Sequence, residues 1–535
     1  MPLDNTDAIW LIKSIESVLN QRYARWELYL TGIVSTARHI RPILERYAQQ
    51  DQRITFVLLE QNRSISAANN VALTLAKGEF VALLESDAEL APTAFYEVAT
   101  YLRAHPKADF IYTDVDQITQ AGDRQNPFFK PDWSPDYFHS YMYTLHLSVY
   151  RTSLVRKIKG FRSEYEGAQY WDLALRISEQ TSQIHHVPKV LYHRRTLPSS
   201  LSSGVDANLR ASRAAQRALQ DMLDRSPYPG WVEKGAKSGL FRVRRHIQRR
   251  PLVSIVIPSA GTHLKIRGQQ VCLLAQCVSS IRRLSTYQNL EIILVDGYDI
   301  SKATLKLVQG ADLKLVRSDQ PFNFSQRMNL AAQSANGEIL LMLNDDTEIM
   351  TSNWIEAMLE LAQQTEIGAV GAKLFYPNGR LQHAGMLILT GKPGHAFHNG
   401  SGNHDGYYYS NIVNRDYLGV TGACMMMRHR LFEELNGFDE SFPLSYNDVD
   451  LCLRAHQAGY RNVFTPYAEL IHYESVSRAN GLSPGIPGEL ERLHEKFAGS
   501  CYLQNDPYYN PNLSSRRPFF QLAWPDGRNQ QRGSR

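Results

Sequence analysis

Apolar runs that end in polar residues recur along this chain and alternate with segments of helical periodicity. Residues 251–258 (PLVSIVIP) and 290–297 (LEIILVDG) are continuous apolar runs, which predicts buried strands. Between them, residues 271–284 place apolar side chains at helical spacing. A third run, 339–343, leads directly into the tripeptide NDD at 344–346. This alternation predicts an α/β fold with a mostly parallel sheet in three layers.

The tripeptide Asn344-Asp345-Asp346 is the most informative chemical signal. A buried strand delivers these side chains to its carboxyl end, where ligands bind in open α/β sheets. Clustered carboxylates suit a hard divalent cation, and such a cation suits a diphosphate. A strand followed by a capped acidic turn has the same pattern, so the other motifs must decide between the two interpretations.

The two halves of the chain resemble each other, which indicates an internal repeat. Asp87 and Glu89 follow the run VALLES as Asp346 and Glu348 follow LLMLN. Later matches keep the same order: Lys159-Gly160-Phe161 with Asn436-Gly437-Phe438, Asp172 with Asp450, and Tyr192-His193 with Ile471-His472. We therefore predict a tandem of two related α/β domains, with the boundary in the Ser-, Pro- and Arg-rich stretch 196–250.

Length and composition are typical of a globular protein with several domains. The 535 residues predict about two to four domains. A hydrophobic content of 43% and a charged content of 21% exclude a disordered chain. The sequence has no apolar run of transmembrane length and no signal-peptide pattern, so we expect a cytoplasmic location. Five cysteines without a CxxC pair favour reduced core residues over a structural zinc site.

The net charge of +5 is too small to indicate a nucleic-acid partner. The one dense basic stretch, 242–250 (RVRRHIQRR), has two interpretations. It fits contact with an anionic surface, which would make the protein peripheral at the inner membrane. It fits a solvated linker between domains equally well.

An ordered series of motifs in the second half resembles glycosyltransferase family 2. The series is VSIVIP, ILVD, FNFSQRMN, GEILLMLNDD, GFDESF and NDVDLCLR, followed by a histidine. Within the family, the chain resembles bacterial tandem transferases of cell-surface polysaccharide assembly, of the O-antigen or rhamnan type. The resemblance implies two tandem GT-A domains with Rossmann-like sheets, the first of them incomplete. It also implies an inverting, metal-dependent transfer of a sugar from a nucleotide-sugar donor to a growing, lipid-linked surface glycan, with Mn²⁺ or Mg²⁺ as cofactor.

This resemblance gives the expected domain organisation. A degenerate or truncated transferase-like domain occupies residues 1–200, and a helical, basic linker occupies 201–250. The catalytic domain occupies 251–480, and a C-terminal extension follows at 481–535.

The resemblance assigns chemical roles in the second half. Asp346 is the expected metal ligand, supported by Asp345 and by Asn344, whose amide stands where the family usually has an acid. His472, at the end of a strand-like segment, matches a histidine that often completes the metal site. Asp448, which precedes the helical pattern LCLRAHQAG, is the expected general base, with a helix N-cap as the alternative role.

Donor binding is expected to involve further residues. Asp296 ends the second strand, where the family has an acid that hydrogen-bonds the nucleotide base. Pro258 and Ser259 follow the first strand and are expected to line the same pocket. Asn329, in FNFSQRMN, and Asn344 are expected to bind the nucleotide sugar. The two residues after Asp296 depart from the family pattern, which leaves the base and the sugar open.

Two weaker groups lie between these motifs. His383, His395 and His398 fall where the family faces donor and acceptor, and a loosely spaced zinc cluster is the alternative. The residues 407–409 (YYY) fit stacking on an acceptor sugar, but a plain exposed loop is the favoured interpretation.

The first half departs from the family pattern where chemistry is expected. Gly32 stands in place of the base-binding acid, and Tyr170 stands in place of the general base. A tyrosine with an ordinary pKa of about 10 is a poor base at neutral pH. Glu85, Asp87 and His193 retain the elements of a vestigial metal site.

The spacing of the first half also predicts a missing strand. In the second half, Pro258 precedes Ser280 by 22 residues. With Ser14 taken as the counterpart of Ser280, the equivalent first strand falls before Met1. A truncated chain is one explanation, and a non-catalytic domain with a structural or acceptor-holding role is another.

Two other functional classes compete with the transferase. One is a non-catalytic glycan-binding or assembly subunit in which both domains are degenerate. The other is a nucleotidyltransferase, which would need a Gly-rich, basic loop after its first strand, where this chain has SAGTHLKIRG. The joint presence of Asp346, Asp448 and His472 favours the transferase.

Overall fold

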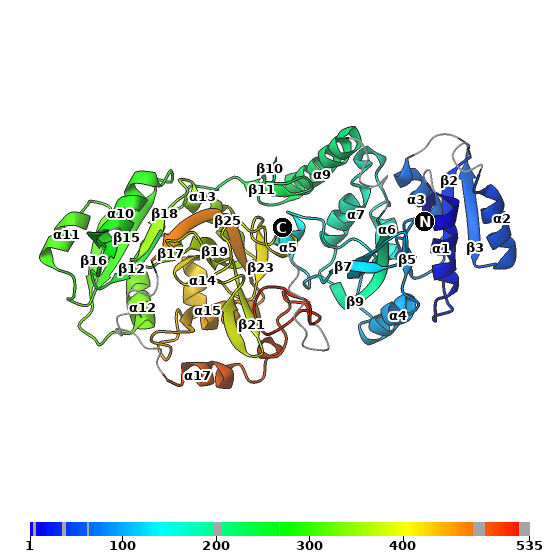
Figure 1. Cartoon of the computed structure of the whole chain (residues 1–535). Coiled ribbons are helices and arrows are strands. Elements are labelled where there is room, and N and C mark those ends of the chain that lie inside the picture. Colours follow the sequence, from blue (N-terminus) through cyan, green and yellow to red (C-terminus); the bar gives the residue numbers. More distant parts are fainter. Residues whose placement is uncertain are drawn as a thin grey trace. The chain divides into compact units, whose positions relative to one another are not determined.

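The computed structural model describes residues 1–3, 7–34, 39–60, 64–196, 205–266, 268–473 and 487–523. The chain divides into two compact units, which are described separately here (Figure 1). The first unit comprises Met1–Trp133 and Phe138–Val243, and the second comprises Ser134–Tyr137 and Arg244–Arg535. The predicted linker differs from this division, because helix α9 (Val205–Arg225) and strand β10 (Gly230–Lys234) belong to the first unit.

The second unit is built on a mixed sheet with the strand order β16-β15-β12-β17-β24-β19-β25-β18. Strands β12, β15, β16 and β17 pair in parallel, whereas β24 is antiparallel to both β17 and β19. The bounds are β12 Val253–Ser259, β15 Leu290–Asp296, β16 Leu313–Arg317, β17 Ile339–Leu343, β18 Thr347–Ile349, β19 Ile367–Phe375, β24 Cys424–Arg428 and β25 Arg461–His472. The parallel pairing brings the carboxyl ends of β12 and β15 together, with Ser259 opposite Asp296.

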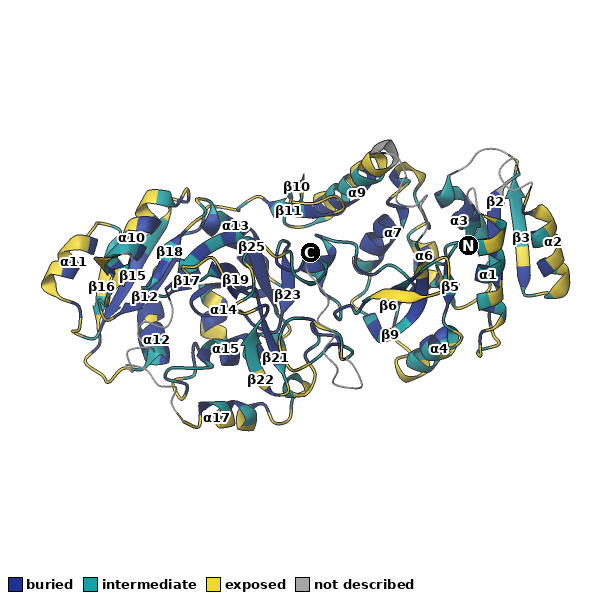
Figure 2. Ribbon diagram, in the orientation of Figure 1, coloured by how far each residue is buried: buried dark blue, intermediate teal, exposed yellow. Residues whose placement is uncertain are grey.

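Helices cover both faces of this sheet. Successive strand residues point to opposite faces, so Ile255 packs with α10 (Leu273–Leu284) and α13 (Trp354–Ala362). Val256 packs in the other layer, with α12 (Phe324–Ser334), α14 (His429–Glu434) and α15 (Asn447–Gln457). Figure 2 shows the inner strands buried between these layers. The remaining named elements are α11 Lys302–Val308, β13 His263–Ile266, β14 Gln269–Cys272, β20 Leu381–His383, β21 Met386–Leu389, β22 Lys392–His395, β23 Arg415–Tyr417 and α17 Glu489–Lys496.

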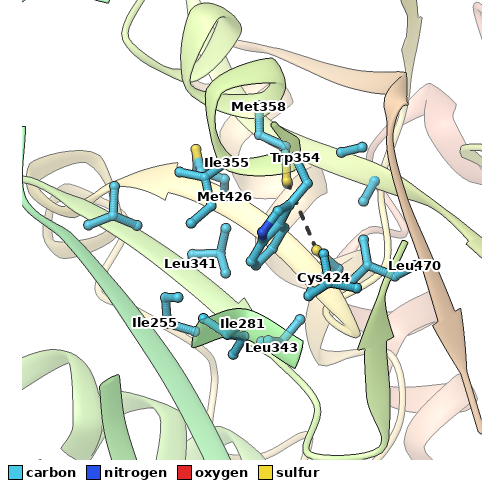
Figure 3. Packing of buried hydrophobic residues seen from close by; sticks show 14 of the residues in the cluster. Ile255, Ile281, Leu341, Leu343, Trp354, Ile355, Met358, Cys424, Met426 and Leu470 are labelled. Carbon is cyan, nitrogen blue, oxygen red and sulfur yellow. Dashed lines mark hydrogen bonds between the residues drawn. The ribbon is translucent and has the colours of Figure 1, made fainter. Parts of the chain in front are cut away.

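Trp354 is the largest fully buried side chain in the core of the second unit. Its ring lies among Leu341, Met426 and Cys424 (Figure 3), and its indole nitrogen donates a hydrogen bond of 2.9 Å to Ser285 Oγ. The side chain therefore fixes α13 against the sheet that carries the candidate site.

Replacing Trp354 by alanine should destabilise the second unit by about 3–5 kcal/mol, because it opens a cavity and leaves the Ser285 hydroxyl without its donor. Urea unfolding followed by circular dichroism measures the change. Trp231→Ala is the matched control, because Trp231 is 38% exposed and should shift the free energy of unfolding by less than about 1 kcal/mol. Equal effects of the two variants would contradict the packing role of Trp354.

The first unit repeats this strand order with one break. Strands β1-β2-β3 form one sheet and β4-β8-β6-β9-β5 form a second, with β7 paired to β6. The strands of the second unit that are equivalent to β1 and β4 are β12 and β17, and these two pair with each other. Since β1 spans only Pro2–Leu3, it is too short to bridge the two sheets. The bounds are β2 Leu28–Ile33, β3 Ile54–Leu59, β4 Phe80–Ala82, β5 Glu89–Leu90, β6 Phe110–Ile118, β7 Arg124–Phe128, β8 Ser148–Arg151 and β9 Ile184–Arg195.

The helices of the first unit follow the same plan as those of the second. They are α1 Ala8–Leu19, α2 Arg41–Gln50, α3 Ile65–Leu75, α4 Ala94–Ala104, α6 Thr152–Lys157 and α7 Gln169–Ser178, and α5 (Pro135–Phe138) lies at the division between the units. Within the described residues, no helix combines the length and the hydropathy that a membrane crossing requires.

Side-chain interactions also repeat, and they confirm the predicted tandem. The amide of Asn70 bonds both the N–H and the C=O of Phe161. Asn329 holds Phe438 in the same way. The ion pair Asp172–Arg176 of α7 likewise recurs as Asp450–Arg454 of α15.

The serine used to place the first strand was matched wrongly. Ser17 accepts a hydrogen bond from the N–H of Leu90, as Ser280 does from the N–H of Ile349. Ser17, rather than Ser14, is therefore the counterpart of Ser280.

Strand β1 itself corrects the predicted position of the first strand. Its residues Pro2–Leu3 pair with Thr31 and Gly32, as Pro258–Ser259 pair with the end of β15. The carboxyl end of the equivalent strand is thus within the chain and does not fall before Met1. The spacing differs because the hairpin β13–β14 lengthens the connection between β12 and α10 in the second unit.

The basic stretch 242–250 is partly incorporated into strand β11 (Phe241–Arg245). The Arg244 guanidinium lies 2.6 Å from the carboxylate of Glu360, and Arg245 is buried. Arg249 and Arg250 are exposed. The interpretation as a solvated linker is therefore wrong for Arg244 and Arg245.

Candidate active site

A cavity of about 840 Å³ lies at the carboxyl ends of strands β12 and β17. Its volume is within the range of about 300–1,000 Å³ that is typical of ligand sites. Most of the site residues predicted from the sequence of the second half line it: Pro258, Ser259, Asn344, Asp345, Asp346, Asp448 and His472. The fold thus brings the expected metal-binding acids and the expected base into one space.

Asp346 and His472 lie together in the cavity, as expected for the candidate metal site. Asp346 Oδ1 lies 2.9 Å from His472 Nε2, and the amide nitrogen of Asn344 lies 3.3 Å from the same ring atom. Burial alone would raise the pKa of Asp346, but the charge and hydrogen bond of His472 bring this pKa below its ordinary value. The carboxylate is therefore ionised at neutral pH.

The other ring nitrogen of His472 defines which atom faces the cavity. Nδ1 is 2.7 Å from the side-chain oxygen of Gln382, which can only accept, so Nδ1 carries a proton. In the neutral ring, Nε2 then presents a lone pair toward the Asp346 carboxylate. Two acceptors at this distance need a proton or a metal cation between them, and Gln382 orients the ring as a supporting residue does in metal sites.

This donor set fits a divalent cation that takes part of its coordination from a ligand. Carboxylate oxygen and imidazole nitrogen both bind Mn²⁺. Among the described residues, no group of three or more His, Cys, Asp or Glu side chains is arranged to hold a metal ion by itself. Mg²⁺ and related cations are commonly held by one or two carboxylates together with substrate phosphates and water. The pair Asp346 and His472 matches that mode of binding.

Asp345 faces a different partner. The Ser259 hydroxyl donates a hydrogen bond to its carboxylate. Burial and then the neighbouring Asp346 charge raise the pKa of Asp345 to about 7. Asp345 therefore connects the end of β17 to the end of β12, and it does not share the histidine with Asp346.

Asp448 occupies the first turn of α15 and lines the same cavity. Its Oδ2 accepts a 2.9 Å hydrogen bond from the N–H of Gly422, and its Oδ1 accepts one of 2.8 Å from the N–H of Val449. These two backbone donors fix the direction of the carboxylate. The N-cap of α15 is Tyr446, so the alternative role of Asp448 as N-cap is wrong, and its role as the base stays a prediction.

Arg327 is a cavity residue that the sequence argument missed. Its side chain is 4% exposed, and it lies 4.8 Å from the centre of the Phe322 ring. Within the described part of the chain, its Nε has no hydrogen-bond partner. The residue lies inside the motif FNFSQRMN, where the asparagines drew attention instead. A buried guanidinium with an unused donor suits an anionic ligand.

Two predicted donor-binding residues do not line the cavity. Asp296 is fully buried, lies 2.8 Å from Arg317 Nη1 and accepts hydrogen bonds from the N–H groups of Asp299 and Ile300. Asn329 holds Phe438 through both ends of its amide. The polar groups of these side chains are engaged in holding the fold, and their roles in donor binding stay predictions.

The histidines 383, 395 and 398 do not form a zinc cluster. His383 Nε2 is approached by the N–H groups of Gly385 and Thr421, so Nδ1 carries the proton and donates to His395 Nδ1 at 2.7 Å. Burial lowers the pKa of His383 well below its ordinary value. The pair thus turns the remaining nitrogen of His395, a cavity residue, into a donor.

A family model described as glycosyl transferase family 2 matches residues 5–159 and 267–435, which is more than half of the chain. The chain belongs to glycosyl transferase family 2. The match covers both units, and their shared strand order is the tandem GT-A arrangement that was predicted.

Relatives of this family 2 chain are longer proteins. It is 38% identical, over 98% of its length, to an uncharacterised protein of Sinorhizobium fredii, and it spans 58% of that protein. It is 36% identical, over 96% of its length, to the O-antigen biosynthesis protein RfbC of Myxococcus xanthus, and it spans 40% of it. Among solved structures, S. aureus TarS with UDP-GlcNAc is 19% identical, with a TM-score of 0.35 over 42% of this chain and 66% of that one.

In the first unit, His193 does not occupy the position that corresponds to His472, where the vestigial site was predicted. Glu89 pairs with His193 across the sheet, whereas the matching Glu348 pairs with the residue before His472. Arg194 therefore takes the place of His472. The prediction for His193 is wrong by one position, because β9 and β25 have different bulges.

The charges around Glu85 and Asp87 in the first unit differ from those around the matching acids of the second unit. His193 Nδ1 lies 2.6 Å from Asp116, so it is engaged away from the acids. Burial raises the pKa values of Glu85 and Asp87, and the positive charge of Arg194 opposes both shifts. The positive charge of Arg194 thus acts on these two acids where the second unit has the Asp346–His472 pair.

The first unit also differs at the position of the expected base. Tyr170 matches Asp448, and burial raises its pKa to about 12. Its hydroxyl therefore stays protonated at neutral pH.

Proposed function

We propose that the second unit transfers a sugar, with inversion, from a nucleotide-sugar donor to a hydroxyl group of a growing surface glycan. The observation that carries the proposal is one cavity that contains both the Asp346–His472 pair and the Asp448 carboxylate. Family membership supports sugar transfer. The name of the Myxococcus relative, an O-antigen biosynthesis protein, supports a surface polysaccharide as the product. The acceptor would be lipid-linked, at the inner face of the membrane.

Asp448 would act as the general base. Its carboxylate takes the proton of the acceptor hydroxyl while the hydroxyl oxygen bonds to the anomeric carbon of the donor. The bond from that carbon to the diphosphate oxygen breaks, and the nucleoside diphosphate leaves with the electron pair. The N–H groups of Gly422 and Val449 hold the carboxylate in place during the transfer.

Asp346 and His472 would hold Mn²⁺ or Mg²⁺, which when bound neutralises the charge of the diphosphate. Asn344 and Asp345 complete this edge of the site. Arg327 would contribute a second positive charge toward the donor, and Pro258 and Ser259 would line the nucleotide side of the cavity.

The first unit would not catalyse transfer. It has Tyr170 in place of the base and Arg194 in place of the metal-ligating histidine. We assign it a structural or glycan-holding role.

Nucleotide release from UDP-, dTDP- and GDP-sugars, with Mn²⁺ or Mg²⁺ and with or without crude lipid-linked glycan, tests the proposal. Metal-dependent release from one donor would identify a transferase and its donor. No release from a folded protein with any donor would contradict it and favour a non-catalytic glycan-binding subunit.

Gln382→Leu should weaken Mn²⁺ binding by about 10–100-fold, because it removes the acceptor that orients His472. Titration of Mn²⁺ by electron paramagnetic resonance, in the presence of the nucleoside diphosphate, measures this. Gln363→Leu is the control, because Gln363 lies outside the cavity. Equal Mn²⁺ affinity of Gln382→Leu and wild type would show that the glutamine does not position the histidine.

A further inference from the structure

Two further cavities continue from the central one along the second unit. Gly394 and His395 line both the central cavity and a second cavity of about 550 Å³. Phe519 lines both this second cavity and a third one of about 360 Å³. The shared residues show that the three cavities adjoin one another in a row, called the path below, that begins at the candidate reaction centre.

The far end of the path has aromatic walls. Phe397 and the tyrosines 407–409 line the third cavity together with Phe519. Phe519 belongs to the segment after α17, more than a hundred residues beyond the tyrosines in the chain. Two distant segments of the sequence thus supply rings to one hollow.

A buried scaffold holds these rings from behind. Phe520 is 4% exposed and stacks on Phe397 at 5.1 Å and on Tyr407 at 5.4 Å between ring centres. The guanidinium of Arg415, itself buried, lies 5.0 Å from the centre of the Phe520 ring. The hydroxyl of Tyr137 donates to the carbonyl oxygen of Tyr408. The wall is therefore fixed in place, as a preformed binding surface requires.

Left-handed backbone is concentrated at this wall. Phe397, Asn399, Tyr408 and Tyr409 have φ values of 55°, 62°, 46° and 72°. This region is unfavourable for residues with a bulky side chain and is maintained where the surroundings enforce it. Such strain is found preferentially at sites that bind ligands.

From these observations we infer that the path binds the body of an oligosaccharide acceptor, several sugars away from the hydroxyl that reacts; the link to transfer rests on the proposed function. The apolar C–H faces of pyranose rings stack on aromatic side chains, and the polar edges of the path offer donors to sugar hydroxyls. Because the path adjoins the central cavity, one glycan would occupy the aromatic wall while its end reaches Asp448.

His395 lies where the path leaves the central cavity. Its Nδ1 accepts a hydrogen bond from His383 Nδ1, so Nε2 carries the proton when the ring is neutral. The aromatic walls of the third cavity assign the path to a chain of several sugars.

Isothermal titration calorimetry without any donor tests this inference on the full chain. The probes are a rhamnan hexasaccharide, chitohexaose, maltohexaose and the corresponding disaccharides. At least one hexasaccharide should bind wild type at least about tenfold more tightly than its disaccharide. Phe519→Ala and Tyr407→Ala should each remove that advantage, whereas Phe519→Tyr should keep it, because the stacking ring remains.

Tyr96→Ala is the matched control, because Tyr96 is 51% exposed and lies on α4 of the first unit. The inference is overturned if no hexasaccharide binds, if hexasaccharide and disaccharide bind equally, or if Phe519→Ala and Tyr407→Ala bind like wild type. Thermal unfolding of each variant confirms that the fold is intact. Loss of transfer with retained, Phe519-dependent binding would instead refute the proposed function and leave the glycan site in place.

Discussion

Asp448→Asn should lower the turnover of sugar transfer by about 10²–10⁴-fold, which is the usual contribution of a general base. The amide cannot take the acceptor proton, but it keeps the size of the side chain and can still accept from the N–H of Gly422. The affinity for the donor nucleotide should therefore stay within about twofold of wild type. Steady-state nucleotide release and calorimetric titration of the nucleoside diphosphate separate the two quantities.

Tyr170→Phe is the control for this variant, because Tyr170 holds the matching position of the first unit. Its hydroxyl has no catalytic role in the proposal, so transfer should be unchanged. A turnover of Asp448→Asn within threefold of wild type would remove Asp448 as the base. A large loss in Tyr170→Phe would show that the first unit takes part in the chemistry.

Asp346→Ala should abolish the transfer that Mn²⁺ supports in wild type. It should also lower the affinity for Mn²⁺ by at least about 100-fold. This estimate exceeds the effect of a supporting residue, because a direct ligand and its negative charge are lost. His472→Ala should weaken Mn²⁺ binding in the same direction. Electron paramagnetic resonance of Mn²⁺ with nucleoside diphosphate present gives the affinity without any requirement for activity.

Asp87→Ala is the matched control, since Asp87 occupies the same position in the first unit. The Arg194 charge acts on Asp87 where the second unit has His472, so Mn²⁺ binding should not change. If Asp87→Ala and Asp346→Ala lower the Mn²⁺ stoichiometry equally, both units bind metal and the assignment to the second unit alone is wrong. If neither variant changes Mn²⁺ affinity, the metal requirement itself is refuted.

The donor-site residues differ in whether the fold leaves their polar groups available, and this difference has a physical cause. A strand end and its acidic tripeptide can be read from the sequence, because the apolar run and its termination are local. The partners of a polar side chain, by contrast, come from segments that are distant in the sequence. Asp296 and Asn329 stand in the expected motifs, yet Arg317 and Phe438 engage their polar groups. Arg327 lies in the same motif, and its burial and unused donor appear only in three dimensions.

Register is the second limit of sequence comparison. Side chains alternate between the faces of a strand, so an error of one residue moves a side chain to the other face. The matching of His193 with His472 follows the sequence, whereas the bulges of β9 and β25 place Arg194 there. The position of the first strand was predicted wrongly for a different reason, because the hairpin β13–β14 alters the spacing between that strand and the following helix.

The sequence by itself determined the tandem α/β fold, the family, and the location of Asp346, Asp448 and His472 at the ends of elements, because these follow from local periodicity and an ordered set of motifs. The tertiary structure decided which polar side chains remain available to a ligand, since hydrogen-bond partners come from distant segments. It also decided that the tyrosines at 407–409 and Phe519 form one wall. No local pattern joins those two segments, and only packing around Phe520 brings them together.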